Sequence, residues 1–189
     1  MIGVVLAGGA SQRFGGQPKG LMMLNGMPMV MHVHQTLSQV CRHVFIEARA
    51  HAGYQALGVD CLYAAPGDEG KGPLAGIAVG LAQAASDDRV AFAPCDMPLL
   101  CPAIFERLGA EPECAYAVSS AGMEPLVCVL PARVLVDARA ALSSARIPGV
   151  RVFLEQVRAV PVHFDDAMAF SNVNTVDDLP RAEAYLVRG

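Results

Sequence analysis

Short apolar runs that alternate with helical segments are the feature of this sequence that most limits its fold. Each run is apolar at successive positions rather than at every second one, which is typical of strands buried on both faces of a parallel sheet. The expected strands are 2–6, 44–46, 59–63 and 90–93, and the expected helices between them are 28–40, a short one near Tyr54, and 73–85. This order predicts an α/β fold, namely a Rossmann-like, three-layer α/β/α domain with a mostly parallel sheet.

The segment 115–130 departs from this alternation. It holds two strand patterns on either side of Ser120-Ala121-Gly122, which predicts a hairpin insertion with an antiparallel edge. Because the chain has 189 residues and no linker-like tract, we expect one domain over 1–189. The elements expected after the hairpin are helices at 132–142 and 152–157, a strand at 160–163, and a last helix that starts at a capping box of Thr175 and Asp178.

Charge and composition narrow the class of partner. The net charge of −4 argues against a general nucleic-acid binder, which would carry a basic surface. No apolar run approaches the roughly 18 to 20 residues of a bilayer-spanning helix, and no basic leader with an apolar core precedes the first strand. The six cysteines form no C-x-x-C pair, so we expect reduced, mostly buried thiols. These features predict a cytoplasmic protein with no membrane or nucleic-acid partner.

A glycine-rich loop follows the first strand and is suited to phosphate. Glycines at 8, 9, 15 and 16 let backbone N–H groups approach a ligand closely, and Arg13 and Lys19 add positive charge. The loop is not a P-loop, because Lys19 is followed by Gly20 rather than by a hydroxyl residue, and it lacks the G-x-G-x-x-G spacing of dinucleotide sites. It predicts a nucleoside triphosphate site, with an ordinary glycine-rich turn as the alternative.

Asp96 follows the strand expected at 90–93. Ligands of open α/β sheets bind beyond the carboxyl ends of the strands, and Mg²⁺ favours one or two carboxylates together with substrate phosphate oxygens. Asp96 is therefore the candidate metal ligand. The alternative is that it caps the helix expected to begin near Pro102.

A third loop leads into the helix expected at 73–85. Pro73 suits a helix start, and the small residues Ala75 and Gly76 would let a flat group such as a nucleoside base or ribose lie against the backbone. A packing role for Gly76 alone remains open.

Four segments occur in a fixed order along the chain. They are Leu6-Ala7-Gly8-Gly9-x-Ser11-x-Arg13-x-Gly15 with Lys19, Gly72-Pro73-Leu74-Ala75-Gly76-Ile77, Pro94-Cys95-Asp96-Met97-Pro98, and Asn172-Val173-Asn174-Thr175. Together they resemble the molybdenum cofactor guanylyltransferases, and the resemblance covers the chain from residue 6 to residue 179. The first segment is common to many nucleotidyltransferases, whereas the last two segments are specific to fewer families.

This resemblance implies transfer of GMP from GTP to the terminal phosphate of molybdopterin, with release of pyrophosphate and with Mg²⁺ as cofactor. It implies that Arg13 and Lys19 stabilise charge on the triphosphate, that Asp96 holds the metal, and that Asn172 and Asn174 lie on the molybdopterin side of the cleft. Transient contact with proteins that donate molybdopterin or mature molybdoenzymes is also implied. The implied nucleotide-binding residues are Leu6, Ala7, Gly8, Gly9, Lys19, Asp68, Gly72, Pro73, Leu74 and Asp96.

Three positions depart from the family pattern, and all concern nucleotide contacts. Pro18 stands where relatives often have Asp, and Glu47 begins the Glu-Ala-Arg stretch where they often have Asn. The acid expected about seven residues before Gly72 falls at Ala65, which leaves Asp68 or Glu69 as substitutes. Since guanine selectivity depends on hydrogen bonds to the base edge, the transfer chemistry is better supported than the choice of base.

Two other functions remain open at this point. One is a cytidylyltransferase for molybdopterin, or a nucleotidyltransferase for another small acceptor, although the Gly8-Gly9 pair favours the guanylyl branch. The other is a nucleotide-binding adaptor without turnover. Loops 14–18 and 64–71, which are rich in glycine and proline, are the candidate lids.

Overall fold

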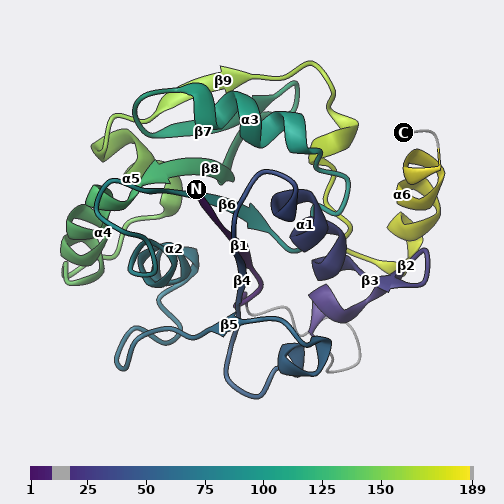
Figure 1. The fold of residues 1–189 in the computed structure, drawn as a ribbon, viewed down its shortest axis with the longest axis horizontal. Coiled ribbons are helices and arrows are strands. Elements are labelled where there is room, and N and C mark those ends of the chain that lie inside the picture. The colour runs from purple at the N-terminus through teal and green to yellow at the C-terminus, as the bar shows by residue number, and fades with distance from the viewer. Residues whose placement is uncertain (10–17, 188–189) are drawn as a thin grey trace.

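The computed structural model describes residues 1–9 and 18–187 and is built around one seven-stranded sheet (Figure 1). The strand order is β5-β4-β1-β6-β8-β7-β9. The predicted α/β class with a mostly parallel sheet is confirmed. The strands are β1 (Ile2–Leu6), β4 (Val44–Glu47), β5 (Cys61–Leu62), β6 (Arg89–Pro94), β7 (Ala115–Ser119), β8 (Gly122–Pro131) and β9 (Val160–His163).

The predicted hairpin lies inside the sheet rather than at its edge. Strand β8 runs antiparallel to both of its neighbours, β6 and β7, whereas β9 pairs in parallel with β7 and forms the border. The expected antiparallel edge is therefore wrong. The physical reason is that β8 pairs with both β6 and β7, while the later strand β9 returns to the free side of β7 and completes its hydrogen bonding, so both strands of the hairpin lie inside the sheet.

Helices cover both faces of the sheet, as Figure 1 shows. Helices α1 (Met29–Ser38) and α3 (Pro102–Ala110) pack on one face, and α2 (Pro73–Leu81), α4 (Leu135–Leu142) and α5 (Val150–Gln156) pack on the other. Successive residues of a strand point to opposite faces. Accordingly Val5 belongs to the core beneath α1, while Val4 and Leu6 belong to the core beneath α2.

A smaller unit lies beside this sandwich. The short hairpin of β2 (Met23–Leu24) and β3 (Met27–Pro28) packs with α6 (Leu179–Leu186) around Leu24, Met29 and Leu99. The capping box predicted at Thr175 and Asp178 is confirmed, and the short 3₁₀ turn that it begins runs into α6. This unit carries the 172–178 segment to the carboxyl ends of the central strands, where Val173 N–H donates to the Asp96 carbonyl at 2.8 Å.

The described residues contain no helix that is both long and apolar enough to cross a bilayer. All six cysteines are free thiols, and Cys41, Cys95, Cys114 and Cys128 are buried, in agreement with the expectation.

Candidate functional site

A pocket of about 1460 Å³ opens over the carboxyl ends of β1, β4 and β6. In open α/β sheets, ligands bind in this position. Residues from the glycine loop, from the end of each of these strands and from the 172–178 segment meet there. The lining includes Leu6, Ala7, Gly8, Gly9, Pro18, Lys19, Glu47, Arg49, Tyr54, Asp68, Glu69, Gly72, Pro73, Asp96 and Asn174.

Lys19 and Asp96 are joined directly at the centre of this pocket. The Lys19 ammonium lies 2.8 Å from Asp96 Oδ2 and donates to Asn174 Oδ1 at 2.6 Å. The Lys19 side chain is only 8% exposed, whereas that of Asp96 is 27% exposed. Charge-assisted hydrogen bonds of this kind hold a side chain in one geometry. The structure thus brings together three of the residues singled out in the sequence.

Asn172 completes this cluster. With its amide nitrogen toward Asp96, it donates to Oδ1 at 3.1 Å and to Oδ2 at 3.3 Å. The segment around Asn174 is in turn held by Asp178, whose Oδ2 accepts the N–H groups of Asn174 and Thr175, each at 2.8 Å. These contacts lower the pKa of Asp178, with the Asn174 amide as the largest cause. The contacts of Asn172 and Asn174 therefore connect both asparagines to the candidate metal ligand, Asn172 directly and Asn174 through Lys19.

The alternative role of Asp96 as a helix cap is wrong. Cys101 is the cap residue of α3, whose first turn begins at Pro102. Next to Asp96, burial raises the pKa of the Cys95 thiol to about 12, so this cysteine stays protonated and is a poor nucleophile. Cys95 is therefore not a candidate nucleophile at this site.

The first part of the glycine loop approaches the end of β4. Ala7 N–H donates to the Glu47 carbonyl at 2.7 Å, and Gly8 N–H donates to Glu47 Oε2 at 3.2 Å. Arg49 Nε donates to the Gly8 carbonyl at 3.2 Å. A Cβ atom on Gly8 would lie 2.6 Å from Glu47 Oε1, so a larger residue here would displace the Glu47 carboxylate from its present position. Arg13, Ser11, Gly15 and Gly16 lie outside the described residues.

Glu47 is a pocket residue that the sequence marked only as a departure from the family pattern. It is 7% exposed, and burial is the main cause that raises its pKa, opposed by the Gly8 amide and by Arg49. Its position at the carboxyl end of a parallel strand was the available sequence signal. Tyr54, which is 1% exposed and lies against Gly20 behind Lys19, was not singled out either.

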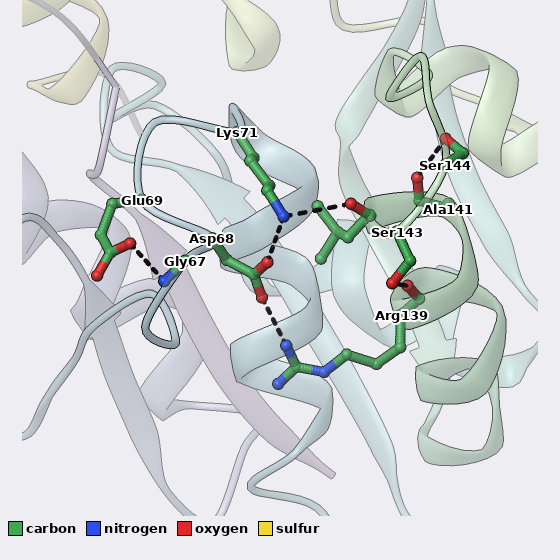
Figure 2. A network of polar contacts seen from close by, with 9 residues as sticks. Gly67, Asp68, Glu69, Lys71, Arg139, Ala141, Ser143 and Ser144 are labelled. Atoms are coloured by element: carbon green, nitrogen blue, oxygen red, sulfur yellow. Dashed lines mark hydrogen bonds and ion pairs between the residues drawn. The ribbon is translucent and has the colours of Figure 1, made fainter.

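The loop 64–72 forms another wall of the pocket and is fixed to α4. Asp68 accepts from Lys71 Nζ at 2.8 Å and from Arg139 at 2.7 Å, and Lys71 also donates to the carbonyl of Leu142 (Figure 2). These cations lower the pKa of Asp68, with Lys71 as the largest cause. Figure 2 shows the two cations reaching the carboxylate from different sides. Asp68 lines the pocket, but both of its oxygens already have partners.

The start of α2 provides a surface for a flat group. Gly72, at φ +76°, turns the chain into the helix, and Pro73 occupies the first turn. Both line the pocket, whereas the Leu74 side chain lies in the core and is 1% exposed. Any contact from residue 74 to a ligand would come from its backbone. A Cβ atom on Gly76 would lie 2.8 Å from Glu47 Oε2, so the packing role considered for Gly76 is present.

The donor set around Asp96 fits a hard cation that is held mainly by its substrate. The described residues contain no group of three or more His, Cys, Asp or Glu side chains that could bind a metal by themselves. Mg²⁺ at nucleotide sites takes one or two carboxylates and completes its shell with phosphate oxygens and water. Asp96 supplies one such carboxylate. Of the first candidate lid, 14–18, residues 14–17 lie outside the described residues. The second candidate lid, 64–71, belongs to the loop that Asp68 fixes to α4.

Comparison with known proteins agrees with this geometry. Residues 3–161 match the family model described as MobA-like NTP transferase domain. The chain is 35% identical over 193 residues to the molybdenum cofactor guanylyltransferase of Cupriavidus metallidurans, with 96% of this chain and 94% of the relative covered. It is 34% identical to the protein of the same name from Desulfosudis oleivorans, with 99% and 96% covered.

Solved structures share the fold. One is the molybdopterin-guanine dinucleotide biosynthesis protein A of Archaeoglobus fulgidus, which is 24% identical, with a TM-score of 0.78 and both chains fully covered. Another is 4-diphosphocytidyl-2C-methyl-D-erythritolsynthase of Anaerococcus prevotii, which is 11% identical, with a TM-score of 0.75 and coverage of 99% and 96%. The first name refers to a guanine nucleotide and the second to a cytidine nucleotide. The fold by itself therefore does not determine which base is bound.

Proposed function

Because this chain belongs to the MobA-like NTP transferase family, we propose that it transfers GMP from GTP to the terminal phosphate of molybdopterin and releases pyrophosphate. The observation that carries the proposal is the cluster of Lys19, Asp96, Asn172 and Asn174 at the carboxyl ends of the central strands. It supports the proposal because it joins the phosphate loop, the candidate metal ligand and the candidate acceptor segment in one connected set of contacts.

In this reaction a molybdopterin phosphate oxygen attacks the α-phosphorus of GTP while the bond to pyrophosphate breaks on the opposite side. Positioning and charge neutralisation supply most of the acceleration in such phosphoryl transfers. Lys19 is a cation that lines the pocket beside the candidate metal ligand, and its ammonium would neutralise charge on the triphosphate. Arg13 is proposed for the same task from the sequence.

Mg²⁺ is the proposed cofactor, and Asp96 is the residue that would hold it. When bound, the ion would neutralise charge on the phosphate oxygens. Asn172 orients the Asp96 carboxylate through its amide, and Asn174 orients Lys19. We place both asparagines on the molybdopterin side, where their remaining hydrogen-bonding capacity would meet the acceptor.

The proposed nucleotide contacts come from backbone and small residues. Amides of the 7–9 segment would orient phosphates and base, and the start of α2 would lie against the nucleoside. Asp68 contributes by holding the loop wall, since its carboxylate is bonded to Lys71 and Arg139. The proposed set is Leu6, Ala7, Gly8, Gly9, Lys19, Asp68, Gly72, Pro73, Leu74 and Asp96.

The wider setting belongs to the proposal as well. It comprises a single domain over 1–189, action in the cytoplasm, and transient contact with proteins that donate molybdopterin or receive the finished cofactor. The relatives named molybdenum cofactor guanylyltransferase support it, because the chain aligns with nearly their whole length.

The test is pyrophosphate release by the purified protein with Mg²⁺, carrier-bound molybdopterin, and GTP, CTP, ATP or UTP supplied separately. We expect pyrophosphate release with GTP that is lost in Asp96→Ala and retained in Asp60→Ala. The second variant is a matched change at a carboxylate that is 68% exposed and pairs with His43. Preference for CTP would indicate the sister activity. Nucleotide binding without release, unchanged in Asp96→Ala, would indicate an adaptor.

A further inference from the structure

Four acidic side chains line the pocket, and they differ in how their oxygens are used. They are Glu47, Asp68, Glu69 and Asp96. Asp96 is paired with Lys19, Asp68 is bonded to two cations, and Glu69 accepts the N–H of Gly67 at 2.7 Å at an exposed part of the loop. The Glu47 carboxylate accepts a single hydrogen bond among the described residues, from the Gly8 amide to Oε2. Its Oε1 therefore retains acceptor capacity.

The position of Glu47 places its free acceptor oxygen, Oε1, near the proposed nucleotide site. The residue ends β4, directly beside Leu6 at the end of β1, and its carboxylate lies between Gly8 and Gly76. Gly8 belongs to the loop proposed to hold the nucleotide, and Gly76 lies in the first turns of α2. A buried carboxylate gains from every N–H donor that reaches it, because an unmet buried acceptor is costly.

We propose that Glu47 selects the nucleobase by accepting hydrogen bonds from the Watson–Crick edge of guanine. This inference rests on the proposed nucleotidyl transfer and deepens it. Guanine presents two adjacent donors on that edge, N1–H and the 2-amino group, which match the two oxygens of a carboxylate. Cytosine and adenine present a ring-nitrogen acceptor there, which a carboxylate repels. Glu47 would thus replace the acid that the family pattern expects where this chain has Ala65.

A second role for Glu47 must be separated from this one. Its hydrogen bond to Gly8 could serve only to orient the phosphate loop, and then every triphosphate would depend on it equally. A base-reading role affects only ligands that carry a base. Inosine triphosphate is the informative probe, because it keeps N1–H and lacks the 2-amino group.

The experiment compares equilibrium binding of GTP, inosine triphosphate, ATP and inorganic triphosphate, with Mg²⁺, to the wild-type protein and to Glu47→Gln. Gln keeps the size of the side chain and an acceptor for Gly8 but replaces one oxygen with a donor. We expect the wild-type protein to bind GTP at least about tenfold more tightly than inosine triphosphate, as a hydrogen bond to a charged group provides. In Glu47→Gln this ratio should fall to about twofold or less, with the affinity for inorganic triphosphate unchanged. Glu69→Gln, the same change at the pocket rim, should keep the wild-type ratio.

An unchanged GTP to inosine triphosphate ratio in Glu47→Gln would overturn the inference and leave the guanylyl assignment intact. Equal loss of all four ligands would also overturn it, because that is the signature of a loop-orienting role. A wild-type protein that prefers CTP in the pyrophosphate-release test would overturn both the inference and the guanylyl assignment. Should Glu47→Gln fail to fold, Glu47→Asp is the second variant, because it keeps the charge and shortens the side chain by one methylene. We expect its ratio of GTP to inosine triphosphate affinity to be at least about threefold below that of the wild-type protein. A wild-type ratio in Glu47→Asp would overturn the inference.

Discussion

Replacing Lys19 by methionine should disable turnover while leaving the protein folded. Methionine keeps the length of the apolar stem and removes the ammonium, so the change takes away the contacts at 2.8 Å to Asp96 and 2.6 Å to Asn174 with little loss of packing. In phosphoryl and acyl transfer, removing one preorganised donor to the developing charge costs about 10²- to 10³-fold in kcat. We expect a loss of that size in pyrophosphate release.

The cost in stability should be much smaller. Breaking a fully buried ion pair costs about 3–5 kcal/mol, and breaking an exposed one costs about 0–1 kcal/mol. The Asp96 side chain is 27% exposed, so water can reach the carboxylate that the variant leaves behind. We therefore expect a loss of about 1–2 kcal/mol, which corresponds to a drop in Tm of about 2–8 °C for a chain of this size.

The assay is kcat and KM for GTP together with thermal unfolding. The control is Lys71→Met, the same change at the other lysine of the chain, whose ammonium holds the loop wall instead of the pocket centre. That control should raise KM while kcat stays within about threefold. A Lys19→Met enzyme with kcat within about threefold of wild type, or one that fails to fold, would refute the reasoning.

Three further predictions concern the surroundings of the site. Arg139→Ala leaves Asp68 with one cation and weakens the attachment of the loop 64–72 to α4, so we expect KM for GTP to rise about three- to tenfold with kcat within about twofold. An unchanged KM in steady-state assays would contradict this role of Asp68. Gly80→Ala should lower the free energy of unfolding in urea by about 1–3 kcal/mol despite the better helix propensity of alanine. The new Cβ would lie 2.7 Å from Phe92 and 2.9 Å from Val4, both fully buried, and a stabilised variant would show that the core relaxes. The pKa of Asp88 is well below its usual range, chiefly because of Arg42, so its stabilising effect is complete above the unfolded pKa of about 3.9 and is lost as the pH falls. Asp88→Asn should thus lose stability at pH 7, and its difference from the wild-type protein should shrink progressively as the pH falls below about 4 toward the lowered pKa of Asp88; a difference that does not depend on pH would contradict this.

Local patterns were sufficient to predict the main layers and much of the site centre. The apolar run at 90–93 identified β6, and the position of Asp96 just beyond its end placed a carboxylate where ligands bind. Pro73 and the capping box at Thr175 likewise predicted helix starts from neighbouring residues alone. These features depend on residues close in sequence, which is why they could be predicted.

Features that depend on distant partners were not predicted. The interior position of β7 depends on where β9 returns, and nothing within the hairpin encodes that return. Asp68 looked available for a ligand because Arg139, its second partner, is 71 positions away in the chain. The burial of Glu47 depends on Gly8 and Gly76, which other elements bring to it. From the sequence alone, Glu47 could be identified only as a departure from the family pattern.

The most direct test of the account is the identity of the product. The wild-type protein, Mg²⁺ and carrier-bound molybdopterin would be incubated with an equimolar mixture of GTP, CTP, ATP and UTP, and the cofactor released from the carrier would be identified by mass spectrometry. We expect molybdopterin joined to GMP, with an equal amount of pyrophosphate. A cytosine dinucleotide, or unmodified molybdopterin with all four nucleotides intact, would contradict it.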